Sequence, residues 1–421
     1  MSRFLSNGSR FAFKRSSSSV AYCAVHIKTG TRNEPEKLNG LAHFTEHLLF
    51  KGTHSKSSCV INSKIEKLGG ELNAYTTKEE TVIHATVLKE DLRTAISLLV
   101  ELAFQCVFPA KEVEKERSVV IEEIKSYKDS PSELIYDEFE ERVFGGTALS
   151  APVLGTALSL RRITREDVED YYHRMFVPEN MVFTVVADLS CERVVSIIEK
   201  ELVRYGGNMS VSGKSVDVDA GLLSEESADE QKTSFIGGGS FEREVGKKSH
   251  QAHCIIGARA YSFYSPKRIP LILLVNYLGG PAANSRLNLV LREKYALVYN
   301  VEASYAQYSD AGVVTLYFGC DKSNVKRCEE LIMRQIYDII EHPLSERRLK
   351  EAKKQLLGQI AISSDNGEAQ VLSMGKSEMV FGEVIEMEKT RELLEKVTSQ
   401  ELSQVAAEIF APRNISKLYY V

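Results

Sequence analysis

The residues best suited to chemistry in this chain lie in one short motif, His43-Phe44-Thr45-Glu46-His47. On a helix, His43 and His47 are about one turn apart, so both imidazoles project from the same face. Two neutral imidazoles placed in this way suit a first-row transition metal, most often Zn2+. Glu46 lies beside His47 and could take a proton from a water on that metal. The alternative is an amphipathic helix with two solvated histidines, and a third ligand would decide between the two.

Two predicted helices would position these groups. The first carries the motif, has apolar residues at helical spacing and ends at Gly52. The second spans Pro109 to Asp129, with an apolar stripe through Val113, Val120, Ile124 and Tyr127. The long charged second helix is the best source of the third protein ligand that a catalytic zinc site needs.

Carboxylates fall on two sides of the second predicted helix. Glu116 and Glu123 lie on one flank of the apolar stripe, whereas Glu114 and Glu122 are interpreted as solvated. Inward carboxylates are uncommon unless they are paired or bound to metal. A salt-bridged surface helix is an equally weighted alternative on periodicity alone.

A predicted hairpin follows the motif. Gly70-Glu71-Leu72-Asn73-Ala74-Tyr75-Thr76 and Thr81-Val82-Ile83 form two alternating segments with a polar turn between them. On the pattern alone, an ordinary structural hairpin is the favoured interpretation.

Composition bounds the class of protein. The chain has 421 residues, which predicts more than one domain, and its 43 % hydrophobic and 26 % charged content is typical of a globular protein. The net charge of -5 argues against a nucleic-acid partner. Seven scattered cysteines without a Cys-x-x-Cys predict reduced thiols in an intracellular compartment. No apolar run reaches transmembrane length, so no membrane partner is expected.

The N-terminus admits two interpretations. Residues 1–19 are rich in serine and basic residues and lack acids, which is typical of an organellar transit peptide. Alternatively, Arg10 to Ile27 is already a strand pair around a serine-rich turn. We expect the structured N-terminus.

A repeat divides the chain. Phe176-Val177-Pro178-Glu179-Asn180 and Phe410-Ala411-Pro412-Arg413-Asn414 each follow an amphipathic helix and precede a strand. This predicts an α+β fold of two similar domains, 1–205 and 247–421, each a mainly antiparallel sheet flanked by helices. The stretch 206–246, rich in serine, glycine and acids, is the predicted linker.

The chain resembles the M16 metallopeptidase family, which includes pitrilysin, insulin-degrading enzyme and the mitochondrial processing peptidase. The resemblance rests on the segments 40–53 and 114–123 and runs from Asn7-Gly8 to the C-terminus. It implies one Zn2+ per chain, bound by His43, His47 and Glu123. It further implies that Glu46 is the general base and that Glu116 orients a ligand.

The resemblance implies further site residues. Asn73 and Ala74 would contact substrate on a strand at the sheet edge. Arg292 and Tyr299 have the seven-residue spacing of a pair that binds the scissile carbonyl in relatives. Without the resemblance, Arg292 would be a surface helix charge and Tyr299 a core strand residue. Relatives commonly have Arg-Gly where this chain has Tyr295-Ala296.

The resemblance also implies a function. The expected activity is a zinc-dependent endopeptidase for peptides or unfolded segments, enclosed in a chamber of which one chain forms half. A homodimer in the bacterial cytoplasm is expected; a heterodimer with a similar chain, and the mitochondrial matrix or a related organelle, are the alternatives. The alternative function is a non-catalytic structural or presequence-binding subunit of a processing-peptidase-like complex. Retention of His43, Glu46, His47 and Glu123 favours the enzyme.

Overall fold

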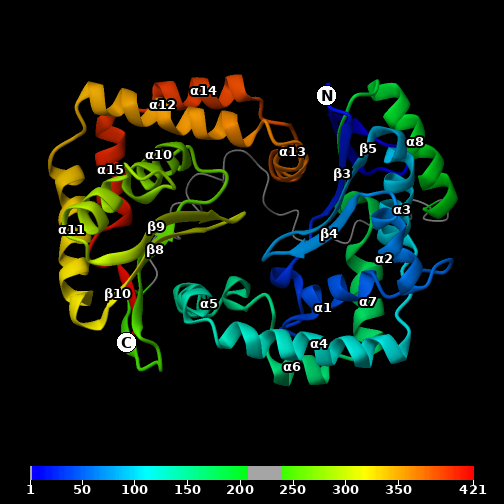
Figure 1. Cartoon of the computed structure of the whole chain (residues 1–421), viewed down its shortest axis with the longest axis horizontal. Helices are drawn as coiled ribbons and strands as arrows, with labels where there is room; N and C mark the ends of the chain where they lie inside the picture. The colour runs from blue at the N-terminus through cyan, green and yellow to red at the C-terminus, as the bar shows by residue number, and fades with distance from the viewer. Residues whose placement is uncertain (1, 207–238) are drawn as a thin grey trace. The chain divides into compact units, whose positions relative to one another are not determined.

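The computed structural model describes residues 2–206 and 239–421 (Figure 1). The chain forms two compact units. The first contains the described residues of Met1–Ser126, Ala151–Ser215 and Ile362–Ile385. The second contains those of Tyr127–Ser150, Val216–Ala361 and Glu386–Val421. Each unit therefore takes one segment from the other half of the chain, which the contiguous boundaries 1–205 and 247–421 do not include.

The first unit is built on a six-stranded sheet. Its strand order is β1 (Ser2–Phe4), β2 (Arg10–Arg15), β6 (Met181–Ala187), β3 (Val20–Ile27), β5 (Thr81–Leu88) and β4 (Glu71–Thr76). Neighbours are antiparallel except β2 and β6, which are parallel. The expected structured N-terminus is present, since β2 and β3 are the two strands predicted within Arg10 to Ile27, but they do not pair with each other because β6 lies between them. All seven residues of β6 are buried, so this apolar strand takes a central place.

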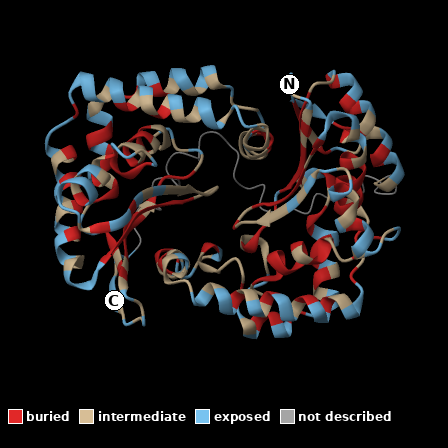
Figure 2. Ribbon diagram, viewed as in Figure 1, coloured by how far each residue is buried: buried red, intermediate tan, exposed pale blue. Residues whose placement is uncertain are grey.

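Helices cover both faces of this sheet. One face shares a core with α1 (Leu41–Leu49), α2 (Ser58–Glu66), α3 (Leu92–Phe104), α4 (Ala110–Lys128), α6 (Ala157–Arg162), α7 (Arg165–Met175) and α8 (Cys191–Tyr205). The other face packs against α13 (Gly367–Phe381), which contributes Val371 and Met374 to a small buried cluster. The inner strands β6, β3 and β5 are accordingly red along most of their length in Figure 2, whereas the edge strands β1 and β4 have no buried residue.

The second unit repeats this sheet order. Its strands are β7 (Glu242–Val245), β11 (Ser416–Tyr420), β8 (Gln251–Ala260), β10 (Gly312–Asp321) and β9 (Val298–Gln307), and only β7 and β11 are parallel. They correspond in order and direction to β2, β6, β3, β5 and β4, which confirms the prediction of two similar α+β domains. The predicted linker 206–246 falls mainly on 207–238, outside the described residues, and its end forms β7.

Helices also surround the second sheet. They are α5 (Pro131–Val143), α10 (Arg268–Gly279), the π-helix Asn288–Lys294, α11 (Val325–Glu341), α12 (Glu346–Ser363), α14 (Met387–Lys396) and α15 (Ser399–Ile409). Helix α5 packs on β8 and β11 through Ile135 and Phe139. Thus α5 from the N-terminal half and α13 from the C-terminal half are exchanged between the units.

The repeated Pro-x-Asn blocks make the same local contact in both units. Asn180 donates from Nδ2 to the carbonyl of Met175 at 3.1 Å, and Asn414 donates from Nδ2 to the carbonyl of Glu408 at 2.8 Å. Each asparagine therefore ties the end of a helix to the start of the following strand.

Within 2–206 and 239–421, no helix is both long enough and apolar enough to cross a membrane.

Candidate metal centre and active site

Helix α1 carries the motif, and its N-terminus is fixed by Gly40 and by the side chain of Glu34. Gly40 precedes it with φ of 92°, a left-handed conformation that favours glycine. The Glu34 carboxylate accepts hydrogen bonds from the backbone N–H of Gly40 at 2.9 Å and of Ala42 at 2.7 Å. Burial raises the pKa of Glu34 to about 8, and these N–H donors oppose the shift. Glu34 therefore fixes the first turn of the motif helix, a role that local sequence did not indicate.

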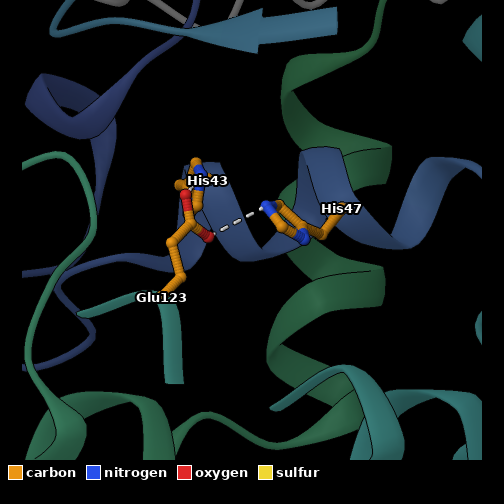
Figure 3. A group of neighbouring side chains, drawn as sticks. All are labelled: His43, His47 and Glu123. Carbon is orange, nitrogen blue, oxygen red and sulfur yellow. Dashed lines mark ion pairs between the residues drawn. The ribbon is translucent and has the colours of Figure 1, made fainter. Parts of the chain in front are cut away.

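Three of the predicted residues come together between α1 and α4. One ligand atom from each of His43, His47 and Glu123 lies within 4.8 Å of the others. Figure 3 shows both imidazoles on α1 facing Glu123. The His43 Nε2 to Glu123 Oε1 distance is 3.9 Å, and the His47 Nε2 to Glu123 Oε2 distance is 3.5 Å. No other group of this kind occurs among the described residues.

These side chains fit a zinc ion. Two imidazole nitrogens and one carboxylate oxygen are a ligand set that leaves a fourth position open. Burial lowers the pKa of His43 to about 3, so its imidazole is in the neutral form that binds metal. Oε2 of Glu123 is buried and accepts no hydrogen bond within the described part of the chain; His47 Nε2, at 3.5 Å, is its ion-pair partner, so a cation between the two atoms would satisfy both.

Glu116 and Lys51 support His47 from behind. Nδ1 of His47 lies 3.0 Å from Glu116 Oε1, and Lys51 Nζ lies 2.7 Å from Glu116 Oε2. Burial alone would raise the pKa of Glu116, but the bonds from His47 and Lys51 hold it below its usual range. An ionised Glu116 accepts the Nδ1 proton, which leaves Nε2 of His47 free on the Glu123 side. The sequence indicated Glu116 but gave no signal for Lys51.

The helix phase of α4 agrees with the expectation. Glu116 and Glu123 face α1, whereas Glu122 is exposed and pairs with Lys125 at 2.7 Å. Burial would lower the pKa of His47, but the Glu116 hydrogen bond and the neighbouring carboxylates raise it overall. The centre therefore concentrates negative charge around a histidine pair, which favours a bound cation.

Glu46 lies on α1 beside the three candidate ligands and is 8 % exposed. Burial raises the pKa of Glu46, and the Glu123 carboxylate adds to the shift. Thr76, the last residue of β4, donates from Oγ1 to Glu46 Oε2 at 3.3 Å. Glu46 is thus a carboxylate of increased basicity next to the candidate metal position.

Asn73 and Ala74 lie on β4, the edge strand of the first sheet. They pair with His84 and Ile83 of β5 on one side, and no described strand pairs with the other side. Helix α1 packs against this strand. A free strand edge thus lies next to the helix that carries the motif.

Arg292 and Tyr299 lie in the second unit, whereas the candidate ligands lie in the first. Arg292 is exposed in the π-helix, and Tyr299 is exposed on the edge strand β9, where its hydroxyl donates to Asp321 at 3.3 Å. Between them, Ala296 has φ of 49°. Glycine adopts this conformation without strain, whereas the Cβ of alanine makes it costly.

Two family models match the chain. The model described as "Insulinase (Peptidase family M16)" matches residues 10–157, and "Peptidase M16 inactive domain" matches residues 162–356. The first match contains every candidate metal ligand and Glu46, and the second contains Arg292 and Tyr299.

Bacterial relatives match over most of their length. An uncharacterized zinc protease, YmxG, of Bacillus subtilis is 29% identical over 386 residues, covering 92% of this chain and 89% of that protein. An uncharacterized zinc protease of Streptomyces coelicolor is 29% identical, covering 92% of this chain and 82% of that protein.

Solved structures share the fold. A protease from Helicobacter pylori has a TM-score of 0.89 at 19% identity, covering 100% of this chain and 98% of that chain. A peptidase M16 inactive domain from Pseudomonas fluorescens has a TM-score of 0.86 at 16% identity, covering 100% and 97%.

Proposed function

The chain belongs to peptidase family M16, and on this premise we propose that it is a zinc-dependent endopeptidase that cleaves peptides or unfolded segments. The observation that supports this most is the convergence of His43, His47 and Glu123 beside the buried carboxylate of Glu46. The zinc-protease names of the relatives support the same metal and reaction class. One Zn2+ per chain would be held by these three side chains.

The proposed chemistry divides between a metal and the chain's own groups. A bound Zn2+ would supply Lewis acidity, which lowers the pKa of a water and polarises a carbonyl. The carboxylate of Glu46 accepts a proton from the attacking water and then donates it to the nitrogen of the leaving amine. Glu116 keeps the Nδ1 proton of His47 in place, and Lys51 holds the other oxygen of Glu116.

The free edge of β4 is the proposed place for the substrate. An extended peptide can add to a strand edge through main-chain hydrogen bonds, which are indifferent to sequence. Asn73 and Ala74 would make these contacts, and an unfolded segment offers the free backbone that they need. Arg292 and Tyr299 are proposed to donate hydrogen bonds to the developing oxyanion. The support for this role is that Arg292 and Tyr299 are seven residues apart, as the family resemblance implies for a carbonyl-binding pair.

The assembly and setting are also proposals. Two copies of the chain would form a closed chamber, with a heterodimer of similar chains as the alternative. The bacterial relatives support a bacterial enzyme, which we place in the cytoplasm, with the mitochondrial matrix as the alternative. Size-exclusion chromatography with light scattering on the purified chain alone would distinguish a homodimer from a monomer that needs another subunit.

Metal analysis combined with peptide hydrolysis tests the activity. We expect about one zinc per purified chain, cleavage of an unstructured fluorogenic peptide, loss of cleavage with a chelator and recovery when zinc is added back. Glu46→Gln should keep its zinc and lose about 10²–10⁴-fold in kcat. Zinc-loaded wild-type protein that cleaves no unstructured peptide would instead favour a non-catalytic subunit. A Glu46→Gln variant with normal turnover would refute the assigned base.

A further inference from the structure

The hydroxyl of Thr76 is a contact between two parts of the proposed site. Thr76 ends β4, the strand proposed to take substrate, and Glu46 lies on α1. Oγ1 of Thr76 donates to Oε2 of Glu46 at 3.3 Å, and among the described residues this is the only hydrogen bond to that carboxylate. We infer that Thr76 is a positioning residue, which orients the general base and links it to the substrate strand. The inference rests on the proposed peptidase function.

The proton of the Thr76 hydroxyl has one good acceptor. Thr81 Oγ1 lies 3.5 Å away, at the limit of a hydrogen bond, and its own proton goes to the carbonyl of Thr29 at 3.0 Å. A hydroxyl has a single proton, and an ionised carboxylate is the stronger acceptor. The Thr76 proton is therefore directed to Glu46 rather than across the hairpin.

The backbone of Thr76 is held firmly enough to act as a reference point. Thr76 pairs with Thr81 in the β4–β5 ladder, and the turn beyond it is closed by a hydrogen bond from Thr77 N to Glu80 O at 2.8 Å. Thr81 is 1 % exposed, so the closed end of the hairpin is anchored in the protein interior. Because the strand end is fixed, the hydroxyl of Thr76 holds Glu46 at a fixed position relative to β4.

The contact also gives the two carboxylate oxygens of Glu46 different roles. With Oε2 held by Thr76, Oε1 of Glu46 is left to accept a proton. A peptide paired with Asn73 and Ala74 would lie beside β4, and Ala74 is two residues from Thr76 on that strand. Substrate pairing and base orientation are therefore set by one rigid element, which favours a fixed distance between the scissile bond and the base.

Two substitutions separate the hydroxyl from the rest of the side chain. Thr76→Val keeps the shape and the β-branched preference for a strand but removes the donor. Thr76→Ser keeps the donor and removes the methyl group. We expect Thr76→Val to lower kcat by about 10–100-fold, since small misplacements of a catalytic group are costly. KM and zinc content should stay within about twofold of wild type, and Thr76→Ser should restore most of the turnover.

A second measurement needs no peptidase activity. Denaturant unfolding of Thr76→Val, Glu46→Ala and the double variant forms a double-mutant cycle. We expect Thr76→Val to shift the unfolding midpoint in the wild-type background and to leave it unchanged in the Glu46→Ala background.

The outcomes separate this inference from the proposed function. Wild-type turnover in Thr76→Val, or equal losses in the Val and Ser variants, would overturn the role of the hydroxyl. If the wild-type protein hydrolyses no peptide, the proposed function fails, and the cycle alone decides whether Thr76 holds Glu46. Identical effects of Thr76→Val in both backgrounds would overturn the inference in that case too.

Discussion

Acidification should destabilise the first unit through one buried imidazole, His26 on β3. The side chain is 0 % exposed, and within the described residues neither ring nitrogen makes a well-formed hydrogen bond, although the backbone of Val371 interacts with the ring. Gly375 of α13 lies against the ring so closely that a Cβ there would collide with it. Burial lowers the pKa of His26 to about 3 from its ordinary 6.5, while Lys376 and His84 add to this shift and the Val371 carbonyl opposes it.

The sign and size follow from proton linkage. Above pH 6.5 the imidazole is neutral in both states, and its contribution to stability is fully present. As pH falls below 6.5 the unfolded chain binds a proton that the folded chain refuses until about pH 3. The free energy of unfolding should therefore fall by about 1.4 kcal/mol per pH unit in this window, or about 2 kcal/mol at pH 5.

The charges around the ring do not supply a partner for the proton. Nδ1 of His84 lies 3.2 Å from Oε1 of Glu368, and Nζ of Lys376 lies 2.8 Å from Oε1 of Glu80. These two carboxylates are therefore already paired. Burial also lowers the pKa of His84, with Glu368 opposing the shift. The wild-type pH dependence will contain His26, His84 and also His43, whose pKa burial lowers too, which makes a comparison with a variant necessary.

Denaturant unfolding of wild type and His26→Leu at several values between pH 7.5 and 5 provides that comparison. Both proteins are kept in chelator, so that zinc release does not contribute. We expect a shallower loss of stability in His26→Leu, with the curves converging by about 2 kcal/mol between neutral pH and pH 5. His54→Gln, at an exposed position, serves as the control and should keep the wild-type slope. Equal slopes in wild type and His26→Leu would refute the reasoning.

The remaining predictions concern the proposed site. Glu123→Gln should weaken zinc binding strongly and Glu122→Gln should not, as measured by chelator competition, because only the former faces the histidines. Glu116→Gln should lose about 10–100-fold in zinc affinity, and equal affinity in all three variants would contradict the assignment. Arg292→Ala and Tyr299→Phe should each lower kcat by about 10²–10³-fold with unchanged zinc content, as for a lost oxyanion donor. Normal steady-state kinetics in both would leave the second unit a structural role.

Elements that depend on local periodicity were predictable from the sequence. The apolar stripe of α4 placed Glu116 and Glu123 inward and Glu122 outward, because helix geometry alone fixes their relative directions. The hairpin of β4 and β5 and the repeated Asn180 and Asn414 blocks were likewise visible as local patterns. The fold class follows from these elements and from the duplicated order of the strands.

Features that depend on distant partners were not predictable. β6 enters between β2 and β3 from more than 150 positions along the chain, and no pattern within β2 or β3 indicates that neighbour. Lys51 and Glu34 are ordinary charged residues in sequence, and their roles appear only when Glu116 and the start of α1 are placed beside them. The strain at Ala296 is also invisible locally, because nothing in the neighbouring sequence indicates a left-handed backbone conformation at this alanine.

The exchange of α5 and α13 has a consequence during synthesis of the chain. The first sheet is complete once β6 emerges, but the helix that covers Ala12, Ala24, Val82 and Val186 belongs to residues 367–381. At roughly 5–20 residues per second, the ribosome needs on the order of 10–40 s to reach that point. An apolar face is therefore uncovered throughout translation of the second half. The nascent first unit should be a client for a ribosome-associated chaperone, and it becomes independent of that help only when nearly the whole message has been read.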